Sequence, residues 1–337
     1  VVGGGPAGAT AANDLARRGH HVLLLDRAGR IKPCGGAIPP RAIRDFDIPD
    51  HMLVAKARSA RMIAPSNTKV DIPIEGGYVG MVDREHFDEW LRERAASHGA
   101  VRRNGKFERV GKDSDGTSTI SFIDGDSGER HTVRARSIIG ADGARSAVAQ
   151  QTIPDADKTK YVFAYHEIVK APALKPHDYD DTRCDVFYQG HLSPDFYGWV
   201  FPHGKTMSVG TGSANKGFSL KGAVADLRQQ MGFDGQTIRR EGAPIPLKPL
   251  KRWDNGRDVV LAGDAAGVVA PSSGEGIYYA MLGGRLAADA AIAFLRTGDA
   301  RELTTARKRF MKEHGRIFFI LGIMQYFWYS SDKRRES

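Results

Sequence analysis

A glycine-rich turn at the start of the chain restricts the folds that it can adopt. The first ten residues read Val-Val-Gly-Gly-Gly-Pro-Ala-Gly-Ala-Thr, and a second apolar run, 21–25, is followed by Asp26. This order predicts a buried strand, a turn too tight for side chains at Gly3 and Gly5, a helix packed closely on the sheet through Gly8, and a second strand. A helix N-terminus attracts a pyrophosphate, and an acid at the end of the second strand can bind ribose hydroxyls. The stretch therefore predicts a dinucleotide site.

The length of the chain indicates more than one structural unit. Its 337 residues exceed what one small core normally holds, so we expect two interleaved domains or one domain with a large insertion. Two residues precede Gly3 in this sequence, whereas a buried parallel strand usually has about five or six. We therefore expect the natural chain to begin before residue 1.

Composition excludes several classes of protein. A content of 41% hydrophobic and 26% charged residues is typical of a globular protein. The net charge of +9 attracts anions, and because nothing resembles a nucleic-acid-binding module, we expect a phosphorylated substrate or anionic lipid. Cys34 and Cys184 form neither a secreted disulfide framework nor a zinc site, and no signal sequence is evident. We predict no metal and a cytoplasmic location.

Hydrophobic patterns predict the elements that follow the first two strands. Aromatic residues at strand-like spacing are frequent between 160 and 212, which indicates a sheet facing a substrate. A helix over 83–95 is expected to begin at Asp83, which can cap it. The remaining predicted elements are a hairpin of 57–64 and 69–74, a meander of 101–110, 118–124 and 131–136, buried strands near 135–140 and 258–262, and a long helix opened by 272–277.

Three distant strand ends share one chemistry. The first glycine motif, Asp142-Gly143 and Gly263-Asp264 each place backbone amides or a carboxylate where a parallel strand ends. Together they point to FAD. With this set the chain resembles the glutathione-reductase-type flavoproteins of the p-hydroxybenzoate hydroxylase fold group. The resemblance implies an α/β fold, α+β overall, with a Rossmann-like FAD-binding domain, an interleaved antiparallel-sheet substrate domain and a helical C-terminus.

The resemblance also implies domain boundaries and cofactor contacts. The FAD-binding domain would comprise 1–56, 78–155 and 252–297, the substrate sheet 57–77 and 156–251, and a C-terminal helical segment 298–337. Asp264 would bind the ribityl chain, and amides near Gly276 and Ile277 would lie under the flavin, where negative charge develops on reduction. The full set of implied cofactor residues is Gly3, Gly5, Pro6, Ala7, Gly8, Asp26, Arg27, Cys34, Gly35, Gly36, Arg84, Asp142, Gly143, Gly263, Asp264, Gly274, Gly276 and Ile277.

A second resemblance narrows the family. Residues 194–202, Pro-Asp-Phe-Tyr-Gly-Trp-Val-Phe-Pro, followed by Gly210-Thr211-Gly212, look like the PxxYxWxFP…GxG signature of geranylgeranyl reductases. The loop 32–39 is similar to that of the chlorophyll and bacteriochlorophyll branch, as are 64–67 and 80–85. The resemblance covers nearly the whole chain. It implies an enzyme in which NADPH-derived electrons pass through FAD to saturate three of the four double bonds of a geranylgeranyl group, giving phytyl.

The residues themselves are compatible with a prenyl substrate. A prenyl chain is apolar, so aromatic side chains suit its tunnel, and aromatic faces can stabilise a developing carbocation. Cys34, Tyr197 and Trp199 are the predicted catalytic residues, with Cys34 near the flavin influencing proton delivery. The alternatives are that the aromatic residues form sheet core and that Cys34 is a packed small apolar residue. The predicted substrate-binding residues are Tyr197, Trp199, Phe201, Pro202, Gly210 and Gly212.

The C-terminal region contains an apolar segment, 316–329, between two basic clusters, 307–309 and 333–335. It is too short to span a bilayer, which needs about twenty residues. Three placements are open: on an anionic membrane, over the entrance of a lipid tunnel, or against the protein's own core. A peripheral position on a photosynthetic membrane is therefore compatible with the sequence, and we expect the natural chain to continue past residue 337.

Several functions remain open at this point. The substrate would be geranylgeranyl diphosphate, which suits the positive charge, or a geranylgeranyl group esterified to (bacterio)chlorophyllide, which suits the apolar C-terminus. The alternative enzymes are a digeranylgeranylglycerophospholipid reductase and an FAD-dependent aromatic monooxygenase. A flavin-binding assembly factor or carrier without turnover is the alternative from a different class.

Overall fold

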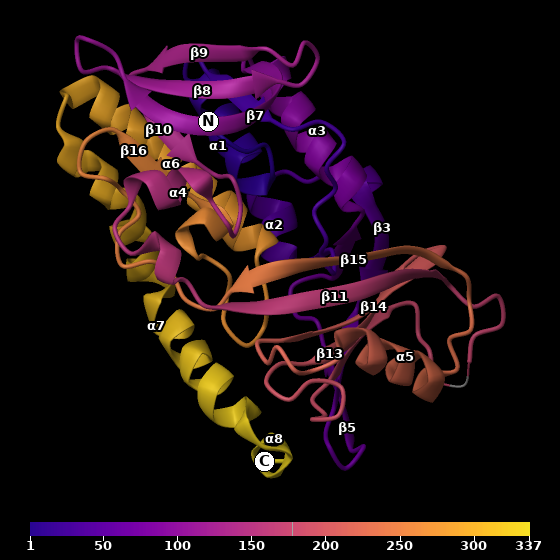
Figure 1. The fold of residues 1–337 in the computed structure, drawn as a ribbon. Coiled ribbons are helices and arrows are strands. Elements are labelled where there is room, and N and C mark those ends of the chain that lie inside the picture. The colour runs from indigo at the N-terminus through magenta and orange to yellow at the C-terminus, as the bar shows by residue number, and fades with distance from the viewer. Residues whose placement is uncertain (177) are drawn as a thin grey trace.

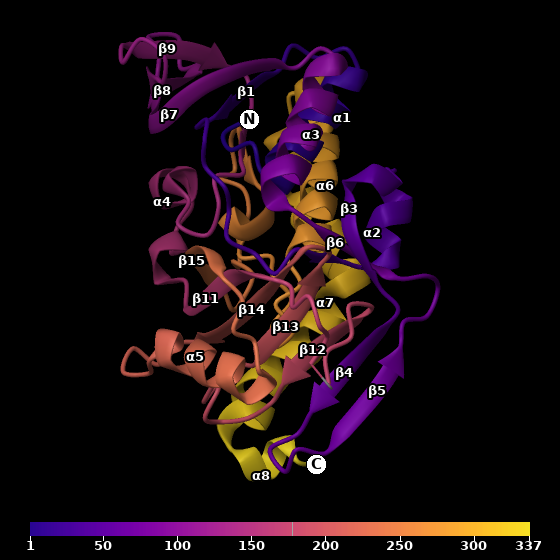
Figure 2. The same ribbon diagram turned by 90° about the vertical axis from the view of Figure 1, so that its right-hand side faces the viewer.

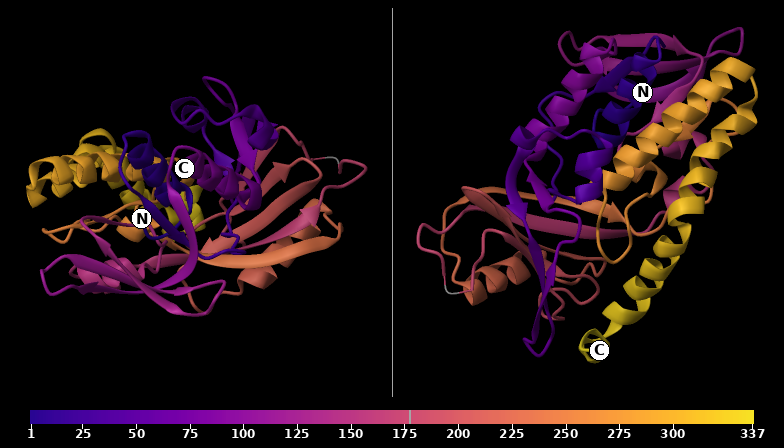
Figure 3. Two further views of the ribbon diagram at one scale, coloured as in Figure 1. Left: turned by 90° about the horizontal axis from the view of Figure 1, so that it is seen from above. Right: turned by 180° about the vertical axis from the view of Figure 1, so that it is seen from behind.

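The computed structural model describes residues 1–176 and 178–337, which form two sheet systems joined by long helices (Figure 1). Strands β7, β10 and β16 lie in the upper half of Figure 1, and a large sheet containing β11, β13, β14 and β15 lies below them. Helices α6 (Ile277–Thr297) and α7 (Thr305–Phe327) run along one side of the molecule, as the view from behind in Figure 3 also shows. The predicted α/β class with a helical C-terminus is confirmed.

The upper sheet is assembled around Val2. Its N–H donates to the carbonyl of Ile139 at 2.9 Å, and its own carbonyl accepts from Ala141 at 2.8 Å. A parallel bridge joins Val2 to Leu25 on the other side. Residues 1–3 therefore act as the middle strand between two parallel pairs. These pairs are β1 (Leu23–Asp26) with β7 (Val101–Lys112), and β10 (Ile138–Gly140) with β16 (Val259–Leu261).

Both faces of the central strands are covered, which explains why β1, β10 and β16 are short, mainly apolar runs. Figure 2 shows α1, α3 and α6 on one side and β7, β8 and β9 on the other. The helix predicted over 83–95 is α3, which begins at Arg84. Asp83 caps it, because its carboxylate accepts from the N–H of Glu85 at 3.0 Å. The covering elements are α1 (Pro6–Arg17), α3 (Arg84–Ser97), β8 (Ser118–Asp124), β9 (Arg130–Ala135) and α4 (Ala147–Thr152).

The lower sheet has seven strands in the order β15-β11-β14-β13-β12-β4-β5. Neighbours are antiparallel except β12 and β4, which are parallel. The hairpin predicted over 57–64 and 69–74 forms β4 and β5, at one edge of this lower sheet. The strands of the sheet are β4 (Ser59–Ile63), β5 (Lys69–Pro73), β11 (Tyr161–Lys170), β12 (Arg183–Phe187), β13 (Gly198–His203), β14 (Thr206–Ser213) and β15 (Thr237–Pro246), and α5 (Leu220–Met231) packs on one face.

A smaller three-stranded sheet connects the two systems. It contains β2 (Ala37–Ile38), β6 (Val79–Val82) and β3 (Leu53–Ala57), with α2 (Pro40–Asp45) beside it. The predicted domain boundaries stay a prediction, although β4 and β5 do leave the upper system and join the lower sheet. The short helical turns are η1 (Asp50–Met52), η2 (Ala156–Lys158), η3 (Gly263–Ala266), η4 (Ala300–Thr304), η5 (Trp328–Ser330) and α8 (Asp332–Arg335).

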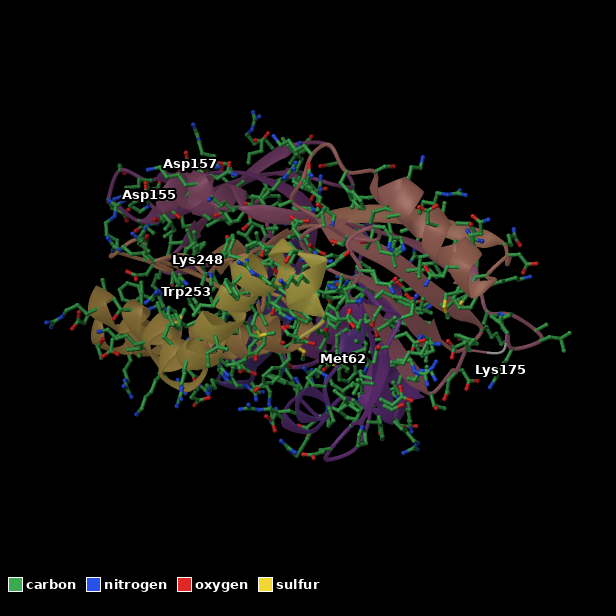
Figure 4. All side chains as sticks on the ribbon, turned by 90° about the horizontal axis from the view of Figure 1, so that it is seen from below. Met62, Asp155, Asp157, Lys175, Lys248 and Trp253 are labelled. Atoms are coloured by element: carbon green, nitrogen blue, oxygen red, sulfur yellow. The ribbon has the colours of Figure 1, made fainter. Side chains whose placement is uncertain are left out.

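Helix α7 has a buried side and an exposed side. Its buried side packs on the protein's own core; for example, the rings of Phe310 and Trp253 lie 5.4 Å apart. Figure 4, seen from below, shows Trp253 and Lys248 beside the C-terminal helices, whereas Lys175 lies at the far end of the lower sheet. Within the described part of the chain, we find no helix that is both long and apolar enough to cross a membrane. The exposed apolar residues of α7 are Ile317, Phe319, Ile320, Ile323, Tyr326 and Phe327.

The crossing of α1 and α6 depends on the absence of a side chain at Gly284, and this gives a test of the fold. A Cβ there would lie 2.2 Å from the carbonyl oxygen of Ala7, whereas a Cβ at Gly322 in α7 meets nothing within 4 Å. We expect Gly284→Ala to lower the free energy of unfolding by about 1–3 kcal/mol through overpacking. Gly322→Ala should raise it by up to about 1 kcal/mol, because alanine favours helix. Urea denaturation measures both changes, and equal effects would contradict this packing.

Candidate functional site

The first glycine motif forms a turn that a larger residue would break. A Cβ at Gly8 would lie 1.8 Å from the carbonyl oxygen of Gly3, and Gly3 itself has φ +99° and abuts Ala141. A Cβ at Gly5 would meet nothing within 4 Å. Helix α1 starts at Pro6 without a side-chain cap. The first turn of α1 therefore presents backbone N–H groups to a space where an anion can bind.

Asp26 stands beside this turn, as the sequence predicted. One of its oxygens accepts from the N–H of Gly4 at 3.0 Å, and the other lies 3.4 Å from Arg92 Nη1. Its side chain is 32% exposed, so the carboxylate keeps room for a further partner. Arg27, also predicted to bind the cofactor, is exposed.

The acids that follow the other two strands, Asp142 after β10 and Asp264 after β16, have different hydrogen-bond partners. Asp142 accepts hydrogen bonds from Ser146 and from the N–H of Val148, and burial raises its pKa above the ordinary value. The side chain of Asp142 is therefore occupied with hydrogen bonds to the start of α4. Gly143, at φ +87°, has open space beside its backbone. Asp264 lies in the first turn of η3, directly after Gly263, and forms an ion pair with Lys32. Sequence reasoning missed this partner, which comes from the loop predicted to lie beside the flavin.

The start of α1, Asp264 and the aromatic strand meet at one cleft of about 1040 Å³, counted to its open mouth; Asp142 and Gly143 do not line it. The cleft joins the N-terminus of α1, the loop before β2, the start of α6 and one face of β11, β13 and β15. Twelve of the predicted site residues line it: Pro6, Cys34, Gly35, Gly36, Arg84, Tyr197, Trp199, Phe201, Asp264, Gly274, Gly276 and Ile277. Its lining also includes residues that sequence reasoning missed, namely Lys32, Tyr165, His166, Glu241 and Glu275.

The aromatic wall of the cleft is fixed by hydrogen bonds and by glycines behind it. Tyr197 Oη donates to the carbonyl of Ser273 at 2.6 Å. Trp199 is nearly parallel to Phe201, with ring centroids 6.1 Å apart. A Cβ at Gly210 would lie 2.2 Å from the indole of Trp199. The predicted substrate residues Pro202, Gly210 and Gly212 are buried and do not line the cleft; the two glycines instead make room for aromatic rings.

The loop 34–36 lies directly on this wall. A Cβ at Gly35 would lie 2.9 Å from the ring of Phe201, and a Cβ at Gly36 would lie 2.8 Å from His203 Nε2. Cys34 Sγ accepts from the N–H of Gly36 at 3.3 Å. Burial lowers the pKa of His203 to about 4, so this imidazole is neutral at pH 7. His203 therefore adds no positive charge to this part of the wall at pH 7.

Arg84 has a protein partner inside the cleft wall. Its guanidinium makes two hydrogen bonds to Asp88, at 2.7 and 2.8 Å, and both residues are buried. Burial opposes the charge, but Asp88 and the nearby Cys34 together raise the pKa of Arg84. The contact with a cofactor phosphate implied for Arg84 stays a prediction, because the structure pairs its charge with Asp88.

A buried polar chain runs behind Trp199. The indole N–H donates to Ser208 Oγ at 3.0 Å, and the same hydroxyl lies 2.7 Å from His166 Nδ1. His166 Nε2 lies 2.8 Å from Glu241 Oε1. His166 is only 3% exposed. Nothing in the sequence pointed to this hydrogen-bonded set, because its residues are far apart and have no ligand-like spacing.

Comparison with known proteins identifies the family. A family model described as an FAD binding domain matches residues 1–311. A geranylgeranyl diphosphate reductase from Rhodobacter capsulatus is 62% identical over 337 residues, covering 100% of this chain and 85% of that protein. A chloroplastic geranylgeranyl diphosphate reductase from Oryza sativa is 39% identical, covering 100% of this chain and 76% of that protein. The chain belongs to the geranylgeranyl reductase family.

More distant relatives of this geranylgeranyl reductase family member agree with its fold. A digeranylgeranylglycerophospholipid reductase from Methanocaldococcus jannaschii is 28% identical, covering 93% of this chain and 82% of that protein. The crystal structure of a geranylgeranyl bacteriochlorophyll reductase-like protein from Thermoplasma acidophilum has a TM-score of 0.87 and 23% identity, covering 99% of this chain and 88% of that chain. The resemblance indicated by the aromatic signature is confirmed at the level of the family by the relatives from Rhodobacter capsulatus and Oryza sativa.

The site of this family member fits FAD, the cofactor of its FAD-binding domain. The space beside Gly5 and the uncapped start of α1 suit a pyrophosphate, and Asp26 suits an adenosine ribose. The cleft continues from there past Asp264 to the start of α6. A flavin bound along this path would meet the aromatic wall. Where each of the predicted cofactor residues touches FAD remains a prediction.

Two alanine substitutions distinguish the role of the turn in folding from its role in binding FAD. Gly8→Ala places a methyl group against the Gly3 carbonyl, so it should destabilise the protein by about 1–3 kcal/mol and abolish FAD binding. Gly5→Ala points a methyl group into open space, so the apoprotein should keep its stability while FAD binds at least 10-fold more weakly. Thermal unfolding of the apoprotein and FAD titration measure the two effects. Unchanged FAD affinity in Gly5→Ala would contradict a pyrophosphate at this place.

Proposed function

We propose that the protein is an FAD-dependent geranylgeranyl reductase of (bacterio)chlorophyll biosynthesis. The observation that carries this proposal is the single cleft in which the dinucleotide-binding edge meets the aromatic wall of Tyr197, Trp199 and Phe201. Bound FAD would supply the hydride for reduction of an alkene. The reaction would saturate three double bonds of a geranylgeranyl group and give phytyl.

Within this proposal, the protein's own residues bind and orient the prenyl chain. Each methylene that the aromatic wall removes from water contributes about 0.8 kcal/mol. The faces of Tyr197 and Trp199 would stabilise positive charge on a reacting carbon. Cys34 would lie beside both flavin and substrate, because it lines the same cleft.

The electron donor and the form of the substrate are finer parts of the proposal. We infer NADPH as the source of electrons from the resemblance to the family. The net charge of +9 favours a diphosphate. The exposed apolar residues of α7 favour a pigment-bound chain delivered from a membrane. The experiments below separate the two.

An anaerobic single turnover tests the proposed reaction. The purified FAD-loaded protein is reduced with dithionite and mixed with geranylgeranyl diphosphate or a geranylgeranylated chlorophyllide ester. We expect flavin reoxidation, followed by absorbance, together with products heavier by two hydrogens for each step. A parallel reduction with NADPH and with NADH identifies the donor.

Other outcomes would favour the alternatives. Reoxidation by digeranylgeranylglycerophospholipid, with neither geranylgeranyl compound active, would favour the lipid reductase. Reoxidation by oxygen coupled to hydroxylation of an aromatic product would favour the monooxygenase. Stable reduced flavin with every prenyl compound, and no coupled hydroxylation, would favour a flavoprotein without turnover.

We further propose that α7 attaches the protein to an anionic membrane surface. The outer apolar face of α7 consists of Ile317, Phe319, Ile320, Ile323, Tyr326 and Phe327. Exposed basic residues lie at both ends of this face, including Lys312 and Arg316 before it and Lys333 and Arg334 after it. An apolar helix face between cations is the pattern that binds anionic lipid interfaces.

Vesicle flotation tests this attachment. We expect the protein to float with vesicles that contain phosphatidylglycerol, and the double variant Phe319→Ser/Ile323→Ser to bind at least 10-fold more weakly, because each side chain loses apolar burial in lipid. Leu174→Ser is the matched control, since Leu174 is 90% exposed but lies outside α7. Equal flotation of all three proteins would contradict attachment through α7.

A further inference from the structure

A carboxylic acid that the proposed function has not used projects into the cleft. Glu275 lies in the loop between η3 and α6, directly before the α6 N-cap Gly276, and it lines the cleft together with Tyr197 and Trp199. Sequence reasoning passed over it because it stands between two glycines that were expected to bind the cofactor through their amides.

The loop that carries Glu275 is held in place by three distant parts of the chain. The N–H of Ser272 donates to Gln325 Oε1 of α7 at 3.0 Å, and the carbonyl of Ser272 accepts from Tyr329 Oη at 2.6 Å. Tyr197 Oη holds the next carbonyl, that of Ser273. Ser272 is buried and has φ +59°, a conformation that a non-glycine residue keeps only where its surroundings enforce it. The position of Glu275 is therefore fixed before any ligand binds.

The two oxygens of Glu275 have different surroundings. Oε1 accepts from the N–H of Tyr278 at 3.1 Å, at the start of α6. Among residues 1–176 and 178–337, Oε2 has no hydrogen-bond partner, and the side chain belongs to the lining of the cleft. Burial raises the pKa of Glu275 to about 7, against the hydrogen bonds from the α6 N-terminus, which favour the anion. A substantial share of the acid is therefore protonated at neutral pH.

The other ionisable groups around the cleft are less suited to release a proton there. Tyr197 already donates its hydroxyl proton to Ser273, and burial raises its pKa far above neutral. His166 has Ser208 on one nitrogen and Glu241 on the other. The groups that face Glu275 or share its cleft are Tyr197, Tyr279 and Cys34 near it, Lys32, Arg84 and Asp264 on the cofactor side, and Tyr165, His166 and Glu241 on the sheet side.

We propose that Glu275 is the general acid that protonates the alkene carbon during each reduction. This inference rests on the proposed function. Saturation of one double bond breaks its π bond and adds one hydride and one proton. Bound reduced FAD would supply the hydride, with both electrons, to form the first C–H bond, and would be left oxidised. The O–H bond of Glu275 would break as the second C–H bond forms. The electron pair of that O–H bond stays on the carboxylate, which regains a proton from solvent before the next step.

The conservative variant Glu275→Gln separates acid catalysis from helix capping. An amide oxygen still accepts from the N–H of Tyr278, so thermal stability and FAD affinity should stay close to those of the wild type. The amide has no proton to give, so the rate of flavin reoxidation by geranylgeranyl diphosphate should fall 10²- to 10⁴-fold in an anaerobic single turnover. Reduction of the flavin by dithionite should be unaffected.

The pH profile gives a signature that a structural role would not produce. Because the protonated acid is the active form, the single-turnover rate of the wild type should be maximal below pH 7 and fall about tenfold per pH unit above it. In Glu275→Gln this decrease in rate above pH 7, the alkaline limb of the profile, should be absent. Glu241→Gln is the matched comparison, since Glu241 is the other glutamate of the cleft, and it should keep the limb whatever its absolute rate.

The outcomes distinguish this inference from the proposed function. If reduced wild-type protein is not reoxidised by either geranylgeranyl compound, the proposed function fails and the inference falls with it. If the wild type is reoxidised but Glu275→Gln reacts at the same rate with the same pH profile, Glu275 is overturned as the acid while the function stands. Loss of the limb in Glu241→Gln alone would move the role to the His166–Glu241 pair.

Discussion

The backbone hydrogen bonds of Val2 are the interaction on which the rest of the molecule depends. They join the β1–β7 pair to the β10–β16 pair, so that the strand ends before Gly3, Asp142 and Gly263 reach one edge of one sheet. Each such bond contributes only about 0.5–1.5 kcal/mol net. Their importance is geometric, because residues from positions 2, 26, 142 and 264 converge on one site only when this sheet is complete.

The second requirement of the site is close contact between backbone and aromatic rings. Gly35 lies against Phe201, and Gly210 lies against Trp199, at places where a Cβ would come within 3 Å of the ring. The loop beside the proposed flavin and the strand beside the proposed substrate can therefore form two walls of one narrow space. The glycines of the aromatic signature act through packing, since Gly210 and Gly212 lie behind the wall and not on it.

Much of this arrangement could be predicted because it is encoded locally. Tight turns need glycine, buried parallel strands are apolar runs, and the cap of α3 needs an acid such as Asp83, so these features could be read directly. Strand β15 escaped prediction because its charged run, Arg239-Arg240-Glu241, is followed by a glycine and two prolines, a composition typical of a surface loop. The contacts of Lys32 with Asp264 and of His166 with Glu241 are set by tertiary structure, and nothing in sequence spacing reveals them. The family and its cofactor followed from motif resemblance more than from chemistry.

The attachment of the loop that carries Glu275 to α7 also affects when the cleft can form during synthesis. Gln325 accepts from Ser272 and donates to the carbonyl of Asp195, a contact that spans 130 positions of sequence. Tyr329 and Arg335 add hydrogen bonds to Ser272 and to Ser193. A growing chain emerges from the ribosome N-terminus first. The upper sheet can therefore close once β16 has emerged, whereas the cleft stays unfinished until the last turns of α7 and the residues after them leave the ribosome.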